Sequence, residues 1–202
     1  MKKIINILFV CAVTLSCKAQ SPIFNITDLE NTTKDIYGAY HKDINNLLDP
    51  FVGTYIYSTE NTTLKIVLQK KIMSSMNGYL YEDLIIGEYQ YIENGLEKAN
   101  TLSKLMIDFS NKRKHSIGGN LIISQASTGC FDCEPNEKAL RGGVAENSTH
   151  NTAELIIRRI TVNVTPAIKI WVMWQMRAKR PSDAPLQDPS FPGGYYTLLK
   201  QL

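Results

Sequence analysis

Cysteine is the residue whose placement in this chain points most directly to chemistry. Cys17 follows an apolar run over residues 4–15, which itself follows the basic start at Lys2 and Lys3. A basic opening and an apolar run too short to span a bilayer are typical of a secretory signal. A Cys directly after such a run, with Ser16 before it, is where bacterial lipoproteins receive diacylglycerol. The sequence therefore predicts a signal peptide over residues 1–16 and lipidation at Cys17, with palmitate or a similar acyl chain.

A second cleavage pattern competes with lipidation. Thr14 stands where such sites usually carry Leu, and Cys17 and Ala19 supply small residues at the two positions that ordinary signal peptidase reads. Lipidation, which we favour, would hold the protein at the bacterial cell envelope, on the outer membrane, at its periplasmic or surface face. Two or three acyl chains bind a bilayer firmly. Cleavage after Ala19 would instead release a soluble periplasmic or secreted protein.

Cys130 and Cys133 form a Cys-x-x-Cys motif. An even pair of cysteines in an exported protein is typical of a disulfide. A redox-active thiol would need a lowered pKa, and the acidic Asp132 and Glu134 beside the motif disfavour a thiolate. We predict a structural disulfide between Cys130 and Cys133 that stiffens a long loop.

The remaining chemistry-bearing residues form no motif. His41, His115 and His150 stand in neither a metal-ligand spacing nor a catalytic-triad signature, and we interpret them as solvated helix or loop residues. The chain also lacks the Gly-x-Ser-x-Gly pattern of a nucleophile elbow. We therefore predict no catalytic, cofactor-binding or metal-ligating residue from sequence motifs.

Aromatic side chains are the other conspicuous set. They are Tyr37, Tyr40, Tyr55, Tyr57, Tyr79, Tyr81, Tyr89, Tyr91, Trp171 and Trp174. One interpretation is packing in a core and between strands. The other is an apolar cavity with phenolic hydrogen-bond donors for a small ligand, for which we name Tyr55, Tyr89, Trp171 and Trp174.

Composition bounds the class of protein. The chain of 202 residues carries 22 basic and 19 acidic side chains, and loss of Lys2 and Lys3 with the signal leaves 20 basic ones. A nearly neutral body does not attract nucleic acid, so we predict no nucleic-acid partner. The length suits one domain. We expect a lipidated tether over residues 17–33 and a single β-rich domain over residues 34–202.

The elements that must position these residues are mostly strands. Helical spacing of apolar residues predicts a short N-terminal helix over residues 35–48. Period-two alternation predicts about eight strands, over residues 51–57, 64–72, 79–92, 102–109, 121–124, 154–164, 168–176 and 195–202. The strand at 168–176 is apolar on both faces, with Trp174 on one and Trp171 on the other. Long loops are expected over residues 125–152 and 178–194. Without a βαβ rhythm, we predict an all-β antiparallel barrel or sandwich.

Several stretches resemble a family of small bacterial lipoproteins that is known only as a domain of unknown function. They are residues 15–20, 38–40 with 42–43, 51–55, 86–95, 130–137 and 194–201. The resemblance covers nearly the whole chain, supports lipidation of Cys17, and implies no activity. More loosely, Gly53-Thr54-Tyr55 after the expected helix is similar to the Gly-x-Trp that opens the barrel of lipocalins, which implies a lipocalin-like architecture.

Two classes of function follow. We expect a non-enzymatic, lipid-anchored module that binds a small apolar ligand or another envelope component, with the membrane as a partner through its anchor. The alternative is an envelope hydrolase whose carboxylates, for example Asp83, Glu88 and Glu154, meet only in the folded protein.

Overall fold

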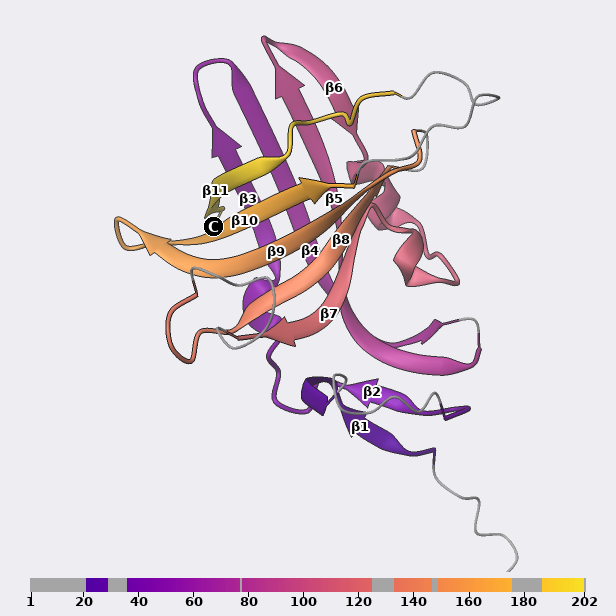
Figure 1. The fold of residues 1–202 in the computed structure, drawn as a ribbon. Coiled ribbons are helices and arrows are strands. Elements are labelled where there is room, and N and C mark those ends of the chain that lie inside the picture. Colours follow the sequence, from indigo (N-terminus) through magenta and orange to yellow (C-terminus); the bar gives the residue numbers. More distant parts are fainter. Residues whose placement is uncertain are drawn as a thin grey trace, which may run out of the picture.

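The computed structural model describes residues 21–28, 36–76, 78–124, 133–146, 149–175 and 187–201 (Figure 1). The strands that the structure describes run from Ile23 to Lys200. The expected signal peptide, Cys17 and Cys130 lie outside the described residues. Among the described residues, no helix is long and apolar enough to cross a membrane.

Eight strands form a closed antiparallel barrel in which each strand pairs with the next along the chain. They are β3 (Gly53–Ser58), β4 (Thr62–Met76), β5 (Leu80–Glu93), β7 (Ile117–Ile123), β8 (Ala139–Glu146), β9 (Asn151–Val162), β10 (Thr165–Trp174) and β11 (Gly194–Lys200). β11 pairs with β3, and β5 pairs with β7, so the eight strands close into a ring. The predicted all-β antiparallel class is confirmed, and the architecture is a barrel rather than a sandwich.

Strand β5 is the element on which the rest is assembled. One edge pairs with β4 along its length, and the other edge is shared by three partners. These are β2 (Tyr40–Lys42) near residue 81, β7 at residues 85–87, and β6 (Leu96–Asn100) at residues 90–93. Strand β1 (Ile23–Asn25) pairs in parallel with β2. The barrel seam between β5 and β7 is thus only three residue pairs long.

Gly87 lets β4 lie close to β5 beside the seam. A Cβ there would lie 2.6 Å from Leu68 Cδ2 and 2.8 Å from the carbonyl oxygen of Val67, both on β4, which is closer than Cβ atoms in proteins come to their neighbours. Beyond Gly87, β5 no longer pairs with β7. There β5 pairs with β6, while β7 remains paired with β8, so the seam is parted. This end of the barrel is therefore open, and we call it the mouth.

The core fills the barrel. Alternate residues of β10, Ile168, Ile170 and Val172, join the interior cluster, with Trp174 packed against it. Trp171 packs on the outer face with a second, small cluster. This alternation confirms the two-faced strand expected from sequence.

The helix expected over residues 35–48 is wrong in its described part. Residues 36–48 form β2 and turns, and a single 3₁₀ turn, η2 (Asp49–Phe51), follows. Gly38 and Asn46 have positive φ of 78° and 53°. The Asp43 carboxylate accepts the backbone N–H groups of Leu47 and Leu48 at 2.8 and 2.9 Å, and such local bonds compete with a helix.

Other boundaries also differ from expectation. Residues 102–106 form the 3₁₀ helix η3 (Leu102–Met106) instead of a strand, and η4 (Lys112–Lys114) follows it. The expected loop at 125–152 contains β8. Within the expected tether, Ile23–Asn25 is strand β1 and Ile26–Asp28 is the 3₁₀ turn η1, so folded structure begins earlier than predicted. Short or glycine-rich strands lack the apolar alternation that sequence reasoning needs.

Candidate functional site

Phe191 closes the mouth of the barrel. Its ring centroid lies 5.1 Å from that of Tyr89, 5.3 Å from that of Trp174, 5.9 Å from that of Tyr91 and 6.3 Å from that of Tyr196. Phe191 is 2% exposed, although it belongs to the connection that precedes β11 rather than to a strand. The connection between β10 and β11 thus supplies the central ring of the aromatic cluster at this end.

The four residues named for a ligand cavity do not all converge. Tyr55, Tyr89 and Trp174 join the interior cluster, whereas Trp171 stacks on Tyr195 on the outer wall, with centroids 5.9 Å apart and rings 11° from parallel. The polar atoms of the interior three bond within the protein. Tyr55 donates to the carbonyl oxygen of Phe51 at 3.0 Å, and the Trp174 indole N–H donates to that of Phe191 at 3.0 Å.

Glu146, at the end of β8, is the polar centre of the mouth. This carboxylate accepts hydrogen bonds from the Tyr89 hydroxyl at 3.1 Å, the Ser190 backbone N–H at 2.8 Å, the Thr149 hydroxyl at 2.7 Å and the Asn151 amide at 3.2 Å. Burial opposes ionisation of Glu146, but the donors from Ser190, Thr149 and Asn151 outweigh it and hold its pKa below the ordinary value. Glu146 is therefore a charged acceptor that binds the connection before β11 to the barrel.

Tyr89 and Tyr196 are kept neutral at the same end. Burial is the main cause that raises the pKa of the Tyr89 hydroxyl, and the nearby carboxylate of Glu146 raises it further. Burial also raises the pKa of Tyr196 to about 12. The Tyr196 hydroxyl donates to the carbonyl oxygen of Pro192 at 2.6 Å. Both phenols therefore act as fixed hydrogen-bond donors inside the mouth.

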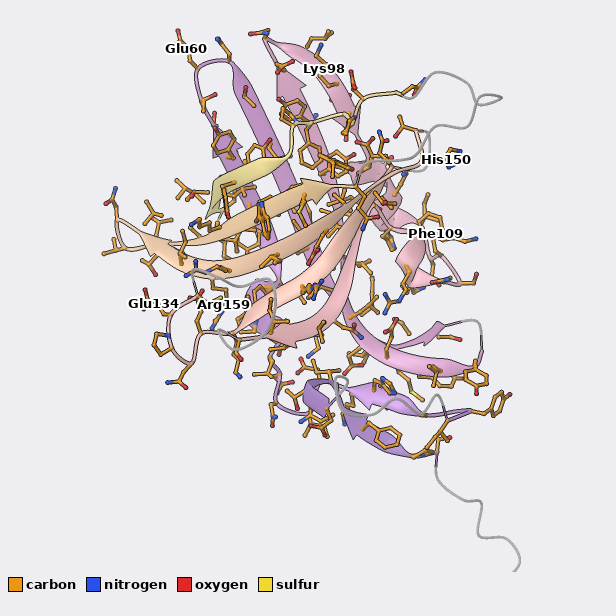
Figure 2. The ribbon with its side chains drawn as sticks, viewed as in Figure 1. Glu60, Lys98, Phe109, Glu134, His150 and Arg159 are labelled. Atoms are coloured by element: carbon orange, nitrogen blue, oxygen red, sulfur yellow. The ribbon has the colours of Figure 1, made fainter. Side chains whose placement is uncertain are left out.

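A groove of about 550 Å³ lies where the seam has parted, and we call it the seam groove. One wall is four consecutive residues, Lys98 to Thr101, and the opposite wall includes Ser116, Ala145 and Glu146. Lys98, Ala99 and Asn100 are consecutive residues of β6, and because successive side chains of a strand alternate in direction, a groove lined by all three lies along the edge of the strand. Figure 2 shows Lys98 on β6 in the upper part of the view, at the open end of the barrel.

The direction of the backbone N–H and C=O groups also indicates that one edge of β6 faces the seam groove. Thr101 donates its N–H to the carbonyl oxygen of Tyr89 at 2.8 Å, so the backbone groups of Thr101 face β5. Those of the preceding residue, Asn100, consequently face the seam groove, because the direction alternates in an antiparallel ladder. Within the described residues β6 pairs with β5 alone, so its other edge carries unpaired backbone groups.

The seam groove continues into two neighbours. It shares Lys98, Asp188 and Ser190 with a groove of about 670 Å³ beside Phe191. It shares Ser116 and Ala145 with a groove of about 360 Å³ on the outer wall. The outer groove runs over Gly118 and Gly143, which pair with each other across β7 and β8. Together the three form a valley from the mouth onto the side of the barrel.

A buried acid and histidine border this valley. Glu88 Oε1 lies 2.8 Å from His115 Nδ1, and the two side chains are 0% and 1% exposed. Glu88 Oε2 is buried without a hydrogen-bond partner within the described part of the chain. The expectation of solvated histidines is wrong for His115 and also for His41, which is 9% exposed. The partners His115 and Glu88 are 27 residues apart, and no local pattern in the sequence links them.

The carboxylates named for a hydrolase play separate parts. Asp83 and Glu88 are an odd number of residues apart on β5 and so point to opposite faces. Asp83 accepts from the Tyr40 hydroxyl at 2.5 Å, and Glu154 on β9 pairs with Arg141 at 2.6 Å. Among the described residues, no group of three His, Cys, Asp or Glu side chains is placed to hold a metal ion.

Cys133 is 3% exposed and packs with Ile123, Ala139 and Ile156 in the small outer cluster. Since Cys130 lies outside the described residues, the predicted disulfide stays a prediction. Lipidation of Cys17 stays one for the same reason.

Comparisons with known proteins give a family for this chain but no activity. A family described as "Family of unknown function (DUF6705)" matches residues 1–201. No curated protein and no solved structure matches the chain. The resemblance to a family without assigned activity is therefore confirmed, while its lipoprotein and lipocalin features stay predictions.

Proposed function

This chain belongs to the family of unknown function DUF6705, and we propose that its barrel is a non-catalytic module that binds an extended peptide segment of another envelope protein in the seam groove. The observation that carries the proposal is the unpaired edge of β6, which forms one wall of that groove. An extended peptide can add to such an edge as a further strand, with backbone hydrogen bonds for affinity and side-chain pockets for specificity.

The walls carry a small excess of positive charge, which suits a peptide with acidic side chains. Lys98 and Lys104 both line the groove, together with the carboxylates of Asp188 and Glu146, and the Lys104 ammonium group lies 3.5 Å from the Ser116 hydroxyl. The carboxylate of Glu146 accepts hydrogen bonds from five donor groups of the protein, the Ser190 hydroxyl included, so it is already engaged inside the mouth. The two lysines therefore supply charge for a partner, which mainly accelerates and selects its association.

The interior is less suited to a small apolar ligand than the groove is to a peptide. Phe191 occupies the space at the mouth between the rings of Tyr89 and Trp174, so a ligand there would have to displace it. The hydroxyls of Tyr89 and Tyr196 donate to protein acceptors. We interpret the aromatic cluster as rigid support for the groove.

The proposal places the module at the bacterial cell envelope. Its basis is the sequence alone, which carries a signal-like opening over residues 1–16 and the candidate lipidation site Cys17. A chain held by two or three acyl groups would present its groove to other envelope proteins.

Selection from a library of random twelve-residue peptides displayed on phage tests peptide binding. The target is residues 21–202, because they contain all the strands that the structure describes. We expect selected peptides to bind the protein and to lose binding when every second residue is N-methylated, since β-strand addition uses those N–H groups. Charge reversal in Lys98→Glu should weaken binding about tenfold, whereas Lys114→Glu, outside the seam groove, should not.

Two results would overturn the proposal. One is the absence of any peptide that binds this barrel and not an unrelated one. The other is binding that tolerates alternate N-methylation, because contacts through side chains alone would then explain it.

A further inference from the structure

Exposed apolar side chains gather at one end of the molecule, which we call the apolar end. They are Ile23, Ile36, Tyr37, Ile44, Ile72, Met73 and Tyr79. Tyr37 is 74% exposed and Ile72 is 72% exposed. In Figure 1 this end is formed by β1, β2 and the β4–β5 hairpin at the lower right. Clusters of this kind on a folded protein mark contact with a partner or a membrane.

Two segments far apart in the sequence are joined here by specific contacts. Gly38 donates its N–H to the carbonyl oxygen of Tyr79 at 2.8 Å, and the rings of Tyr37 and Tyr79 lie 5.5 Å apart, edge to face. Tyr40 on β2 pairs with Tyr81 on β5. The chain at β2 and the start of β5 are therefore held together at the apolar end.

Ile72 and Met73 are exposed because the pairing of β4 with β5 is irregular at these two residues. The register of β4 against β5 shifts between Lys71 and Ser74, so both residues stand outside the ladder. Met73 has a φ of 47°, a conformation that a bulky residue rarely adopts. Its N–H is held by the carboxylate of Asp83 at 2.9 Å. Strain and bulges of this kind are found where a side chain is aimed for function.

The chain enters the fold at the same end. Pro22 accepts the N–H of Tyr40 at 2.9 Å, and Ser21 lies beside Gly38. Cys17 is four residues before Ser21, so a fully extended chain places it at most about 14 Å away. An acyl chain at Cys17 would therefore hold the apolar end, rather than the mouth, close to a bilayer.

We propose that the apolar end docks on the surface of a lipid bilayer, with its side chains at the boundary between headgroups and acyl chains. Tyrosine with aliphatic residues is the composition that such interfaces favour. The orientation rests on the proposed lipidation of Cys17. Because β5 runs from β2 at residue 81 to the seam groove at Tyr89, eight residues further along, docking at this end leaves the groove at most about 27 Å along the strand from the lipid.

Flotation with vesicles of phosphatidylethanolamine and phosphatidylglycerol tests the docking itself. We would use residues 21–202, which lack Cys17 and contain all the strands of the described part of the chain. The double variant Tyr37→Ser/Ile72→Ser should partition about tenfold less than the unchanged protein, since two largely exposed apolar side chains are removed. Met106→Ser/Val164→Ser is the matched control, because Met106 and Val164 are 91% and 94% exposed but lie outside the apolar end.

The possible outcomes distinguish membrane docking from self-association of the chain. No vesicle binding by the unchanged protein, or an equal loss in the control variant, would overturn docking. A dimer in analytical ultracentrifugation that the Tyr37/Ile72 variant dissociates, without vesicle binding, would assign this end to a second copy of the chain and also overturn it. Equal thermal unfolding of all variants would show that folding is not the cause. Acylation of Cys17 is read separately, by metabolic labelling with palmitate, and peptide binding by the phage selection.

Discussion

The carboxylate of Glu146 accepts the backbone N–H of Ser190 at 2.8 Å, across 44 residues of chain. This contact joins the end of β8 to the connection before β11, and Phe191 is the next residue of that connection. The closed mouth of the barrel therefore depends on one buried charge. The first two predictions concern that charge.

Glu146→Gln should lower the free energy of unfolding by about 2 kcal/mol, because an amide cannot accept from all the donors that surround this position and leaves buried groups unpaired. Urea denaturation measures the change. Glu97→Gln, at an exposed position of β6, is the control and should alter stability little. A loss below about 0.5 kcal/mol for Glu146→Gln would mean that the donors relax to solvent.

Acid should weaken the same contact. The donors around Glu146 lower its pKa below the ordinary 4.5. Between the two values the unfolded chain binds more protons, so the stability contributed by Glu146 is full above pH 4.5 and is lost as the pH falls through the folded pKa. Denaturation at several acidic pH values should show a shallower loss in Glu146→Gln than in the unchanged protein. Equal slopes would contradict the assignment.

Alkali should destabilise the fold through its buried phenols. Burial, and for Tyr40 also the Asp83 carboxylate, raises the pKa of Tyr40 and Tyr196 from 10.0 to about 12. Their contribution is complete below pH 10.0 and is lost as the pH rises toward 12, because the folded state retains protons that the unfolded state releases. Ultraviolet titration of tyrosinate should show late-ionising residues, fewer by one in Tyr196→Phe. Ionisation of every tyrosine near the ordinary value would refute this.

Phe191→Ala should cost about 3–5 kcal/mol, because it removes the ring on which the mouth cluster is packed. It should also open a space between Tyr89 and Trp174. Thermal unfolding measures the loss, and Trp174 fluorescence with an added apolar dye measures access to the space. Met106→Ala, at a 91% exposed position, is the control. Dye binding by the unchanged protein would instead favour a natural apolar ligand in the mouth.

The close packing of β4 on β5 should reject a side chain at Gly87. Gly87→Ala places a Cβ 2.6 Å from Leu68 Cδ2, and we expect a loss of about 1–3 kcal/mol from the forced shift. Gly118→Ala is the matched variant on the neighbouring strand, where the nearest heavy atom would be 4.0 Å away. Chemical denaturation should separate the two clearly. Similar stability for both would show that β4 can move away from β5.

Some of the site was within reach of sequence reasoning. Tyr89 and Trp174 were named as candidate ligand residues, and both lie at the mouth, beside Phe191. The rest was out of reach, because its partners come from distant segments. Glu146 fell inside an expected loop, and Ser190 lies in a Pro-rich connection with no periodic pattern.

The sequence by itself determined the all-β class and most strand positions, because a half-buried strand must alternate apolar and polar residues, as β10 does. Only the tertiary structure decided where the barrel parts, which acids become buried acceptors, and why residues 36–48 are not a helix. Asp43 shows the physical reason. Its carboxylate accepts Leu47 and Leu48 locally and the Lys70 ammonium group at 2.8 Å from another strand. A carboxylate that accepts local backbone N–H groups and also binds a cation on a distant strand produces no periodic pattern in the sequence.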